Sequence, residues 1–270
     1  MAVTTQDTLI AAMTGAQRKV WVKANVTAVA GRMCSLWSGA GQPGVGSTTL
    51  GQAAAGVVPV DTDTGFQTFT NPGSGSTYIA GISGVSAASG VIVVWDNLWT
   101  WGSGGSGWSV TTTTAQNTTT PAALTRPDST GEGTEAWLEV LATMGAGAAT
   151  PVLSYTNQAG TAGRTTGTMG YNSAAIIGSM YNFPLTAAGD WGVRSVQSLT
   201  LSVSMTSGTA RVMILRRLAT IPVVANVGFK YNAYDLGLPV VSNDAALMIG
   251  VQASSTASGP TQLEMILAQG

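Results

Sequence analysis

The residue types that most often perform catalysis are scarce in this sequence. It holds no histidine and a single cysteine, Cys34, among 270 residues. Without an imidazole, the chain cannot build a Ser-His-Asp or Cys-His nucleophile, and it cannot ligate zinc, copper or haem through histidine. One thiol allows neither an intramolecular disulfide nor a cysteine-rich metal site. The sequence therefore predicts a protein that is not an enzyme, with no catalytic residue, no metal site and no cofactor.

Acidic residues are the remaining candidates for chemistry, and four of them lie close together: Asp128, Glu132, Glu135 and Glu139. Glycoside hydrolysis needs two carboxylates roughly 5 to 10 Å apart. Glu135 and Glu139 lie four residues apart in a strand-like pattern, which separates them by about 13 Å at 3.3 Å per residue. We therefore interpret these carboxylates as solvated charges on a strand face, and a polysaccharide-degrading enzyme is the least favoured class of function.

Two further patterns resemble ligand-binding motifs. The string DTDTG at 61–65 resembles the start of a calcium loop, but Pro72 stands where the loop needs its bidentate glutamate. The spacing GxGxxG occurs at 39–44 and at 102–107, yet neither match is followed by a helical pattern that would bind phosphate. Because the chain contains 35 glycines, such matches arise by chance. We expect neither calcium nor nucleotide binding.

The densest side-chain feature is a run of tryptophans separated by Asn, Ser and Gly: Trp95, Trp99, Trp101 and Trp108. Large indole rings fill hydrophobic cores, anchor protein interfaces and stack on the faces of sugar rings. The run is therefore compatible with a structural core, a subunit interface or a carbohydrate platform. The sequence alone leaves these three interpretations open.

Two adjacent arginines, Arg216 and Arg217, follow the apolar run at 212–215. Successive side chains of a β-strand point to opposite faces, so the two guanidinium groups should lie on opposite sides of a sheet. We expect at least one of them to meet a carboxylate or a subunit boundary.

The clearest helical pattern lies at residues 4–14, where a threonine cap precedes an acidic first turn and Gly15 stops the helix. Leu9, Ile10 and Met13 are predicted to share one face. This face could pack on its own domain or dock on a neighbouring subunit, and the sequence favours neither.

The second half of the chain has a regular β pattern, with strands predicted at 135–143, 150–156, 174–183, 193–204, 209–218, 246–253 and 262–268. Alternation is cleanest near Leu199, Leu201 and Val203, which should share a buried face opposite hydroxylated residues. Shorter β-like runs precede these strands. The fold class is therefore predicted as all-β, an antiparallel β-sandwich or jelly roll with a short N-terminal helix and a Gly/Thr-rich N-terminal region.

Changes in composition along the chain suggest two parts. Residues 1–77 are expected to form the helix and a glycine-rich anchoring arm, and residues 78–270 the sandwich domain. The threonine-rich stretch at 111–121 reads as a soft linker or an edge strand.

Charge is unusually low, with 11 basic and 12 acidic residues and 9% charged positions, against about 25% in typical soluble domains. This excludes nucleic-acid binding through bulk electrostatics and is typical of surface that ends inside an assembly; a neutral monomer with a hydroxyl-rich coat is the alternative. No window reaches the roughly 18 apolar residues of a membrane span. The first 19 residues lack signal-peptide features, so we expect synthesis in a cytoplasm and no membrane partner.

Several strings together resemble a family of tailed-bacteriophage virion structural proteins, usually described as head- or capsid-associated. The resemblance covers about residues 78–270 and is strongest from 131 to 220. The strings are WDNLW at 95–99, TTTT at 111–114, GEG at 131–133, WLEV at 137–140, SYTNQAGTAGRT at 154–165, GVRSV at 192–196, LRRLAT at 215–220 and LAQG at 267–270. The resemblance implies a β-rich, non-enzymatic component of the phage particle, made in the cytoplasm of the bacterial host.

Composition and resemblance together predict a capsid decoration or cement protein. It would form a homo-oligomer, with a trimer favoured, and would contact the major capsid protein or other virion proteins. The alternative is a tail, neck or spike protein that binds host glycans. The interface candidates are Leu9, Ile10, Met13, Trp95, Trp99, Trp101, Trp108, Arg216 and Arg217.

Overall fold

The computed structural model describes residues 3–24, 27–127, 129–172 and 174–270. Strands account for 41% of the chain and helices for 5%, so the prediction of an all-β protein with antiparallel sheets is confirmed. No helix within the described ranges is both long and apolar enough to cross a membrane.

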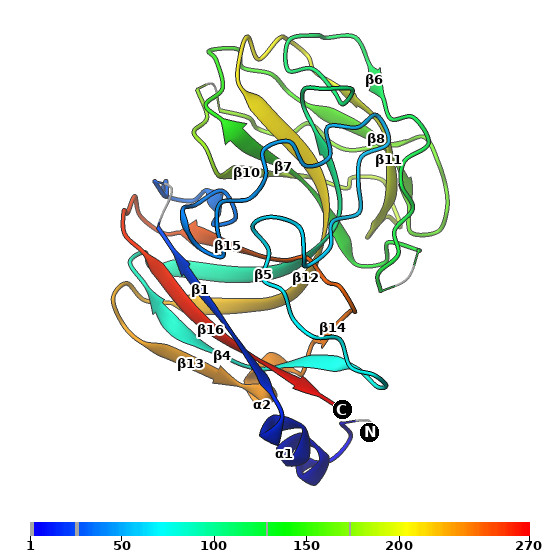
Figure 1. Ribbon diagram of the computed structural model, residues 1–270. Helices are drawn as coiled ribbons and strands as arrows, with labels where there is room; N and C mark the ends of the chain where they lie inside the picture. Colours follow the sequence, from blue (N-terminus) through cyan, green and yellow to red (C-terminus); the bar gives the residue numbers. More distant parts are fainter. Residues whose placement is uncertain (1–2, 25–26, 128, 173) are drawn as a thin grey trace. The chain divides into compact units, whose positions relative to one another are not determined.

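The chain divides into two compact units that are interleaved in sequence (Figure 1). Unit 1 consists of residues 1–46, 60–96 and 218–270, and unit 2 of residues 47–59 and 97–217. Two long strands, β5 (Gly90–Gly102) and β12 (Thr209–Val223), each begin in one unit and end in the other. These units differ from the ranges 1–77 and 78–270 that the composition suggested, because strands of the first 77 residues pair with strands from the C-terminal end.

Unit 1 contains an antiparallel sheet whose strands lie side by side in the order β13-β4-β16-β1-β3, with β14 also paired to β4 (Figure 1). Their bounds are β13 Phe229–Asn232, β4 Thr77–Ser86, β16 Thr261–Gln269, β1 Gln17–Lys23, β3 Gly41–Gln42 and β14 Val240–Val241. In β16, the alternating residues Leu263, Met265 and Leu267 are buried. One face of this sheet therefore covers a core.

A second group of strands in unit 1 has the antiparallel order β2-β15-β5, with β2 at Met33–Ser35 and β15 at Leu247–Ala253. Ile249 of β15 lies opposite Val94 of β5. Both residues belong to one hydrophobic cluster with Ile79 and Met265 of the first sheet. The core of unit 1 is thus shared between its two groups of strands.

Unit 2 also has two groups of antiparallel strands. In the first, β7 (Thr134–Ala142) pairs with β10 (Ser179–Phe183) and with β12. The second has the order β6-β11-β8-β9, with β6 Gln116–Asn117, β11 Val193–Thr200, β8 Val152–Asn157 and β9 Arg164–Thr165. The core cluster joins Trp99, Leu138, Tyr155 and Val196.

Each of the seven ranges predicted as strands in the second half contains one, but their ends differ from the prediction. β11 stops at Thr200, and Val203 is exposed, so the expectation that Val203 shares the buried face is wrong. The reason is that the chain leaves the sheet there, and Ser202 Oγ accepts a hydrogen bond from Thr150 N at 2.8 Å. In the threonine-rich stretch at 111–121, only the two-residue strand β6 forms.

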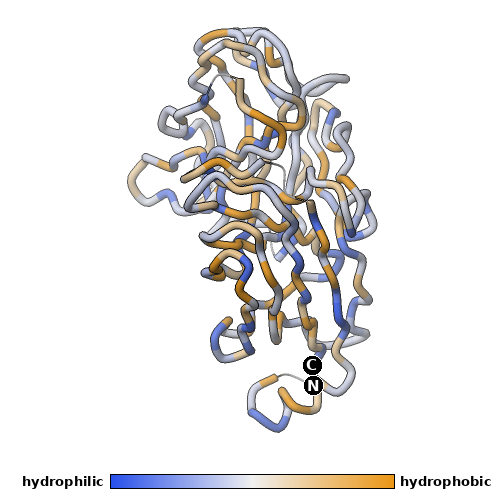
Figure 2. Tube along the Cα trace, turned by 90° about the vertical axis from the view of Figure 1, so that its left-hand side faces the viewer, coloured by the Kyte–Doolittle hydropathy of each residue, from blue (hydrophilic) through white to orange (hydrophobic). Residues whose placement is uncertain are grey.

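The predicted N-terminal helix is confirmed as α1 (Gln6–Thr14), which begins after the N-cap Thr5 and ends at Gly15. In Figure 2, this helix forms the coil beside the N label and carries both strongly apolar and strongly polar positions. A second, short helix, α2 (Ala233–Leu236), was not predicted from the sequence; Asn232 caps it by accepting from Tyr234 N and Asp235 N.

Candidate functional site

Helix α1 packs on the unit 1 sheet through only part of the predicted apolar face. Leu9 and Ala12 contact the sheet residues Ala80 and Ala268, whereas Ile10 is 59% exposed and Met13 is also exposed. Because successive helical residues are rotated by about 100°, Ile10 and Met13 form a stripe beside the packed face. The three side chains lie within a 100° arc of the helix, as expected, but only Leu9 packs on the sheet, so Ile10 and Met13 remain as an uncovered apolar stripe.

A groove of about 220 Å³ lies between the first turn of α1 and the α2 region. The N-terminal segment lines it with Val3, Gln6 and Leu9, and the α2 region lines it with Tyr234 and Leu238. Figure 1 shows α1 and α2 at the same end of the unit 1 sheet.

Local geometry explains why Tyr234 is displayed there. The cap at Asn232 starts α2, and Gly237 ends it with a left-handed φ of 70°, a conformation that glycine adopts without strain. The tight α2 turn leaves the Tyr234 ring 74% exposed. We use the name α1 surface for the exposed residues Gln6, Ile10, Met13 and Tyr234 together with the half-buried Val3 and Leu238.

The four tryptophans of the predicted interface or platform, Trp95, Trp99, Trp101 and Trp108, are all buried within the chain. In unit 2, the Trp99, Trp101 and Trp108 rings pack in sequence, with centroid separations of 6.3 and 6.4 Å. Trp108 Nε1 donates to Trp101 O at 2.9 Å. Strand β5 is buried along nearly its whole length, so neither of its faces is available to a partner. Of the three interpretations left open by the sequence, the structure supports the core.

The arginine pair in the middle of β12 behaves as predicted in one respect. Arg217 Nε lies 2.9 Å from Glu135 Oε1, and its Nη2 lies 3.2 Å from Glu135 Oε2. Arg216 is half-buried and Arg217 is exposed. The expectation that one guanidinium meets a carboxylate is confirmed.

The acidic group does not form a catalytic pair among the residues that the structure describes. Glu139 is fully buried and its carboxylate contacts Arg211, with Arg211 Nε 2.6 Å from Glu139 Oε2. Its interpretation as a solvated charge is therefore wrong, because Arg211 lies directly opposite it in the β7–β12 ladder. Burial lowers the pKa of the Arg211 guanidinium, and the Glu139 charge opposes that shift. Glu132 is exposed, and Asp128 lies outside the described residues.

The calcium-like string uses its carboxylates to shape turns. Asp61 Oδ2 accepts from Phe69 N, and Asp63 Oδ2 accepts from Val60 N, both at 2.9 Å. Cys34 is buried. Over the described part of the chain, no cluster of three or more His, Cys, Asp or Glu side chains could hold a metal ion.

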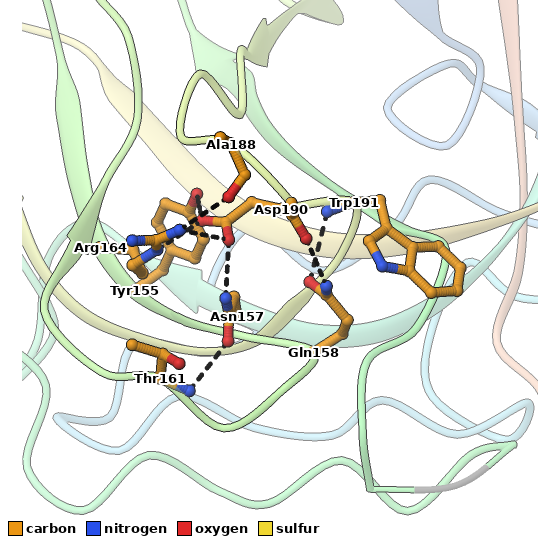
Figure 3. A network of polar contacts seen from close by, with 9 residues as sticks. Tyr155, Asn157, Gln158, Thr161, Arg164, Ala188, Asp190 and Trp191 are labelled. Carbon is orange, nitrogen blue, oxygen red and sulfur yellow. Dashed lines mark hydrogen bonds and ion pairs between the residues drawn. The ribbon is translucent and has the colours of Figure 1, made fainter.

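A polar network that the sequence reasoning missed lies in unit 2, between the turn after β8 and the loop before β11 (Figure 3). Its centre is Asp190, whose side chain is completely covered. Arg164 binds both carboxylate oxygens through Nε and Nη2 at 2.9 Å, and Tyr155 and Asn157 each donate at 2.6 Å.

These contacts shift the pKa values of the network. The hydrogen bond from Arg164, followed by those from Tyr155 and Asn157, holds the pKa of Asp190 well below its usual value against the opposing effect of desolvation. Burial and the Asp190 carboxylate raise the pKa of the Tyr155 hydroxyl. Asp190 is therefore an ionised acceptor with its oxygens occupied, which suits a structural clamp rather than a general acid or base.

The next residue, Trp191, is held by the same clamp but points its ring away from the carboxylate (Figure 3). Gln158 donates to Gly189 O at 2.8 Å and accepts from Trp191 N at 3.3 Å. Trp191 is 55% exposed. The sequence offered one indirect indication of this exposure. Trp191 lies outside every predicted strand, between Gly189 and Gly192.

No family model matches the sequence, and neither the curated proteins nor the solved structures contain a match. The resemblance to virion proteins of tailed phages therefore stays a prediction. Two exposed features of the described residues are candidates for function, the α1 surface and the loop that carries Trp191.

Proposed function

We propose that this protein is a non-enzymatic structural component of a tailed-phage virion, and specifically a capsid decoration protein that docks through the α1 surface. The observation that carries the proposal is the uncovered stripe of α1, where Ile10 and Met13 face solvent, at the same end of the unit 1 sheet as α2 with its exposed Tyr234. Burying a side chain such as Ile or Met contributes about 1.5 to 3 kcal/mol. A partner that covers this stripe would therefore gain substantial binding energy.

The distribution of charge supports docking through neutral contacts. Only 9% of positions are charged, and eight of these side chains form four pairs within the chain: Arg18–Glu264, Arg164–Asp190, Arg211–Glu139 and Arg217–Glu135. Interface cores are depleted of charge. Binding that rests on apolar burial should be nearly independent of salt.

The proposed partners are the major capsid protein or other virion proteins, and the proposed assembly is a homo-oligomer with a trimer favoured. A β-sandwich of jelly-roll type, an architecture common among virus shell proteins, is part of the proposal. Repeated contacts on a shell add through effective concentration, so each α1 surface needs only a modest affinity. The proposed location is the phage particle.

Binding of the purified protein to phage heads that lack it tests the proposal. Ile10→Asp should weaken binding at least tenfold, because it places a charge in the stripe. Val224→Asp is the matched control, since Val224 is an exposed apolar residue on another part of unit 1. Equal binding of Ile10→Asp and wild type, or equal weakening by both variants, would contradict docking through α1.

The competing assignment is a neck, tail or spike protein that recognises host glycans. A decoration protein occurs in many copies per particle, whereas a spike or neck protein occurs in few. Quantitative mass spectrometry of purified particles measures this copy number directly. A count of a few copies would exclude the decoration role while leaving a virion role intact.

A further inference from the structure

We propose that Trp191 and Arg194 form a binding site for acidic polysaccharide, with a sugar ring stacked on the indole and an anionic group of the sugar held by the guanidinium. This inference goes beyond the docking role and is independent of it, because it concerns unit 2 and not the α1 surface.

The exposure of Trp191 is the first argument. The chain has eight tryptophans, and the other seven are all buried. Leaving a large indole 55% exposed forgoes hydrophobic stabilisation. A flat apolar ring presented to water is suited to stacking on the apolar face of a pyranose.

The second argument is that the ring is carried on a pre-ordered loop. Asp190 takes four hydrogen bonds from three side chains, and Arg164 also donates to Ala188 O at 3.1 Å. Gln158 fixes the loop on the other side through Gly189 and Trp191 (Figure 3). Binding a ligand on a rigid loop costs less conformational entropy than ordering a mobile one.

The third argument distinguishes a sugar from a protein partner. Trp191 is the only large apolar side chain left exposed on the segments 157–164 and 187–194. Protein interfaces surround their aromatic anchors with further apolar contacts that exclude water. These two segments otherwise contribute amide, hydroxyl, guanidinium and backbone groups, which can hydrogen-bond to sugar hydroxyls.

Arg194 supplies the cation that an acidic sugar would need. The segments 154–166 and 186–198 contain three charged residues, Arg164, Asp190 and Arg194, of which the first two neutralise each other. The segment 131–134, which packs against Gly192 and Arg194, adds the exposed carboxylate of Glu132. Arg194 is exposed and forms no ion pair with any residue in the described ranges.

The position of Arg194 makes a combined site possible. Its Nη1 lies over the turn after β8, 3.4 Å from the point that a Cβ on Gly160 would occupy. Gln158 N, from the same turn, bonds to Gly192 O at 3.2 Å. Three residues of extended chain separate the Trp191 and Arg194 Cα atoms by at most about 10 Å, which an oligosaccharide can span.

Iodide quenching of tryptophan fluorescence provides the test, because Trp191 is the accessible indole. Polygalacturonate, alginate and hyaluronan are the acidic probes, and dextran is the neutral one. We expect at least one acidic polymer to bind and to protect the wild-type protein from iodide. Trp191→Ala should weaken that binding at least tenfold, and Arg194→Gln should weaken it severalfold. Tyr234→Ala, which removes an exposed aromatic ring from the α1 surface, should leave it unchanged.

Three results would overturn the proposal. One is the absence of binding to all three acidic polymers at millimolar saccharide concentration. Another is unchanged affinity of Trp191→Ala, provided that its circular dichroism matches wild type. The third is a loss of oligomer mass in Trp191→Ala without any effect on polymer binding, which would identify a protein contact instead. Docking to phage heads should survive Trp191→Ala, so failure of this site and failure of the decoration role are distinguishable.

Discussion

Two glutamates on β7, only four residues apart, lie in opposite environments. The Glu139 side chain is 0% exposed and faces Arg211, which is equally covered. The Glu135 side chain is 25% exposed and pairs with Arg217, which is still more exposed. Residue type, strand and counter-charge are the same at both positions. Burial is therefore the variable that differs between the two pairs, and we expect it, and not pairing itself, to decide what each ion pair contributes to stability.

The register of the β7–β12 ladder produces this difference. On β12, Arg211 lies directly opposite Glu139, whereas Leu215 lies directly opposite Glu135. The Glu135 side chain therefore pairs with Arg217, two residues further along β12. Glu135 also lies one residue from the start of β7, where water has access. Removing two charges from water costs free energy, and in a buried pair only the attraction between the two charges offsets that cost. An exposed pair gains little, because water weakens the attraction between its charges.

The largest effect is expected from breaking the buried pair. Glu139→Gln leaves the Arg211 charge buried without its carboxylate and should lower the free energy of unfolding by about 3 to 5 kcal/mol. Urea unfolding followed by circular dichroism measures it. The double variant Glu139→Leu with Arg211→Met should recover most of the loss, because an apolar pair needs no desolvation. A single variant as stable as wild type would refute the comparison.

Asp190 should have the next largest effect, because its carboxylate is covered but its partner Arg164 is partly exposed. The pKa of Asp190 is lowered in the folded state, so the unfolded chain binds the proton more readily. The contribution is therefore complete above the ordinary Asp pKa of about 3.9 and is lost as the pH falls below it. Asp190→Asn should be less stable at pH 7 and should lose less stability than wild type on acidification, as measured by urea unfolding across pH. Parallel pH profiles would contradict this.

Lys23 is a buried cation whose partners are backbone carbonyls, so it shows the effect of burial without a carboxylate partner. Its Nζ lies 3.1 Å from Gly39 O and 3.0 Å from Gly44 O, and burial lowers its pKa to about 8. Above pH 8 the folded state releases this proton while the unfolded state keeps it, so stability should rise with pH. The rise should be on the order of 1 kcal/mol by pH 10 after screening. Lys23→Met should abolish it in thermal unfolding measured over the same range; an unchanged slope would assign the rise to other groups.

The smallest effect is expected at the exposed pair. Glu135→Gln should change the free energy of unfolding by less than about 1 kcal/mol, since surface pairs contribute little. Added salt should reduce even this difference. Denaturant curves at low and high ionic strength would show it. A loss as large as that of Glu139→Gln would mean that burial is not the deciding variable.

Local pattern was sufficient to locate the helix and most strands. Alternation of apolar and polar residues reports which face of a strand is covered, and the threonine cap with Gly15 bounds α1. The composition likewise determined that neither histidine chemistry nor a disulfide is possible. These properties depend on residues that are neighbours in sequence, or on counting alone.

Long-range pairing decided the rest. Strand β5 is buried on both faces because residues distant in sequence pack on it, so Trp95, Trp99 and Trp101 became core, and Trp108 packs against Trp101. On α1, Leu9 packs against the small sheet residues Ala80 and Ala268, whereas Met13 stays exposed.

The clearest case is the loop of Trp191. The pairing of β8 with β11 brings the turn after Asn157 beside Gly192, and only then can Arg164 clamp Asp190 from 26 positions away. The sequence by itself determined the strand pattern, the low charge and the absence of histidine. Which tryptophan stays in water, and which carboxylate is removed from it, was decided by the tertiary structure, because burial is a property of the segments that come together and not of the residue alone.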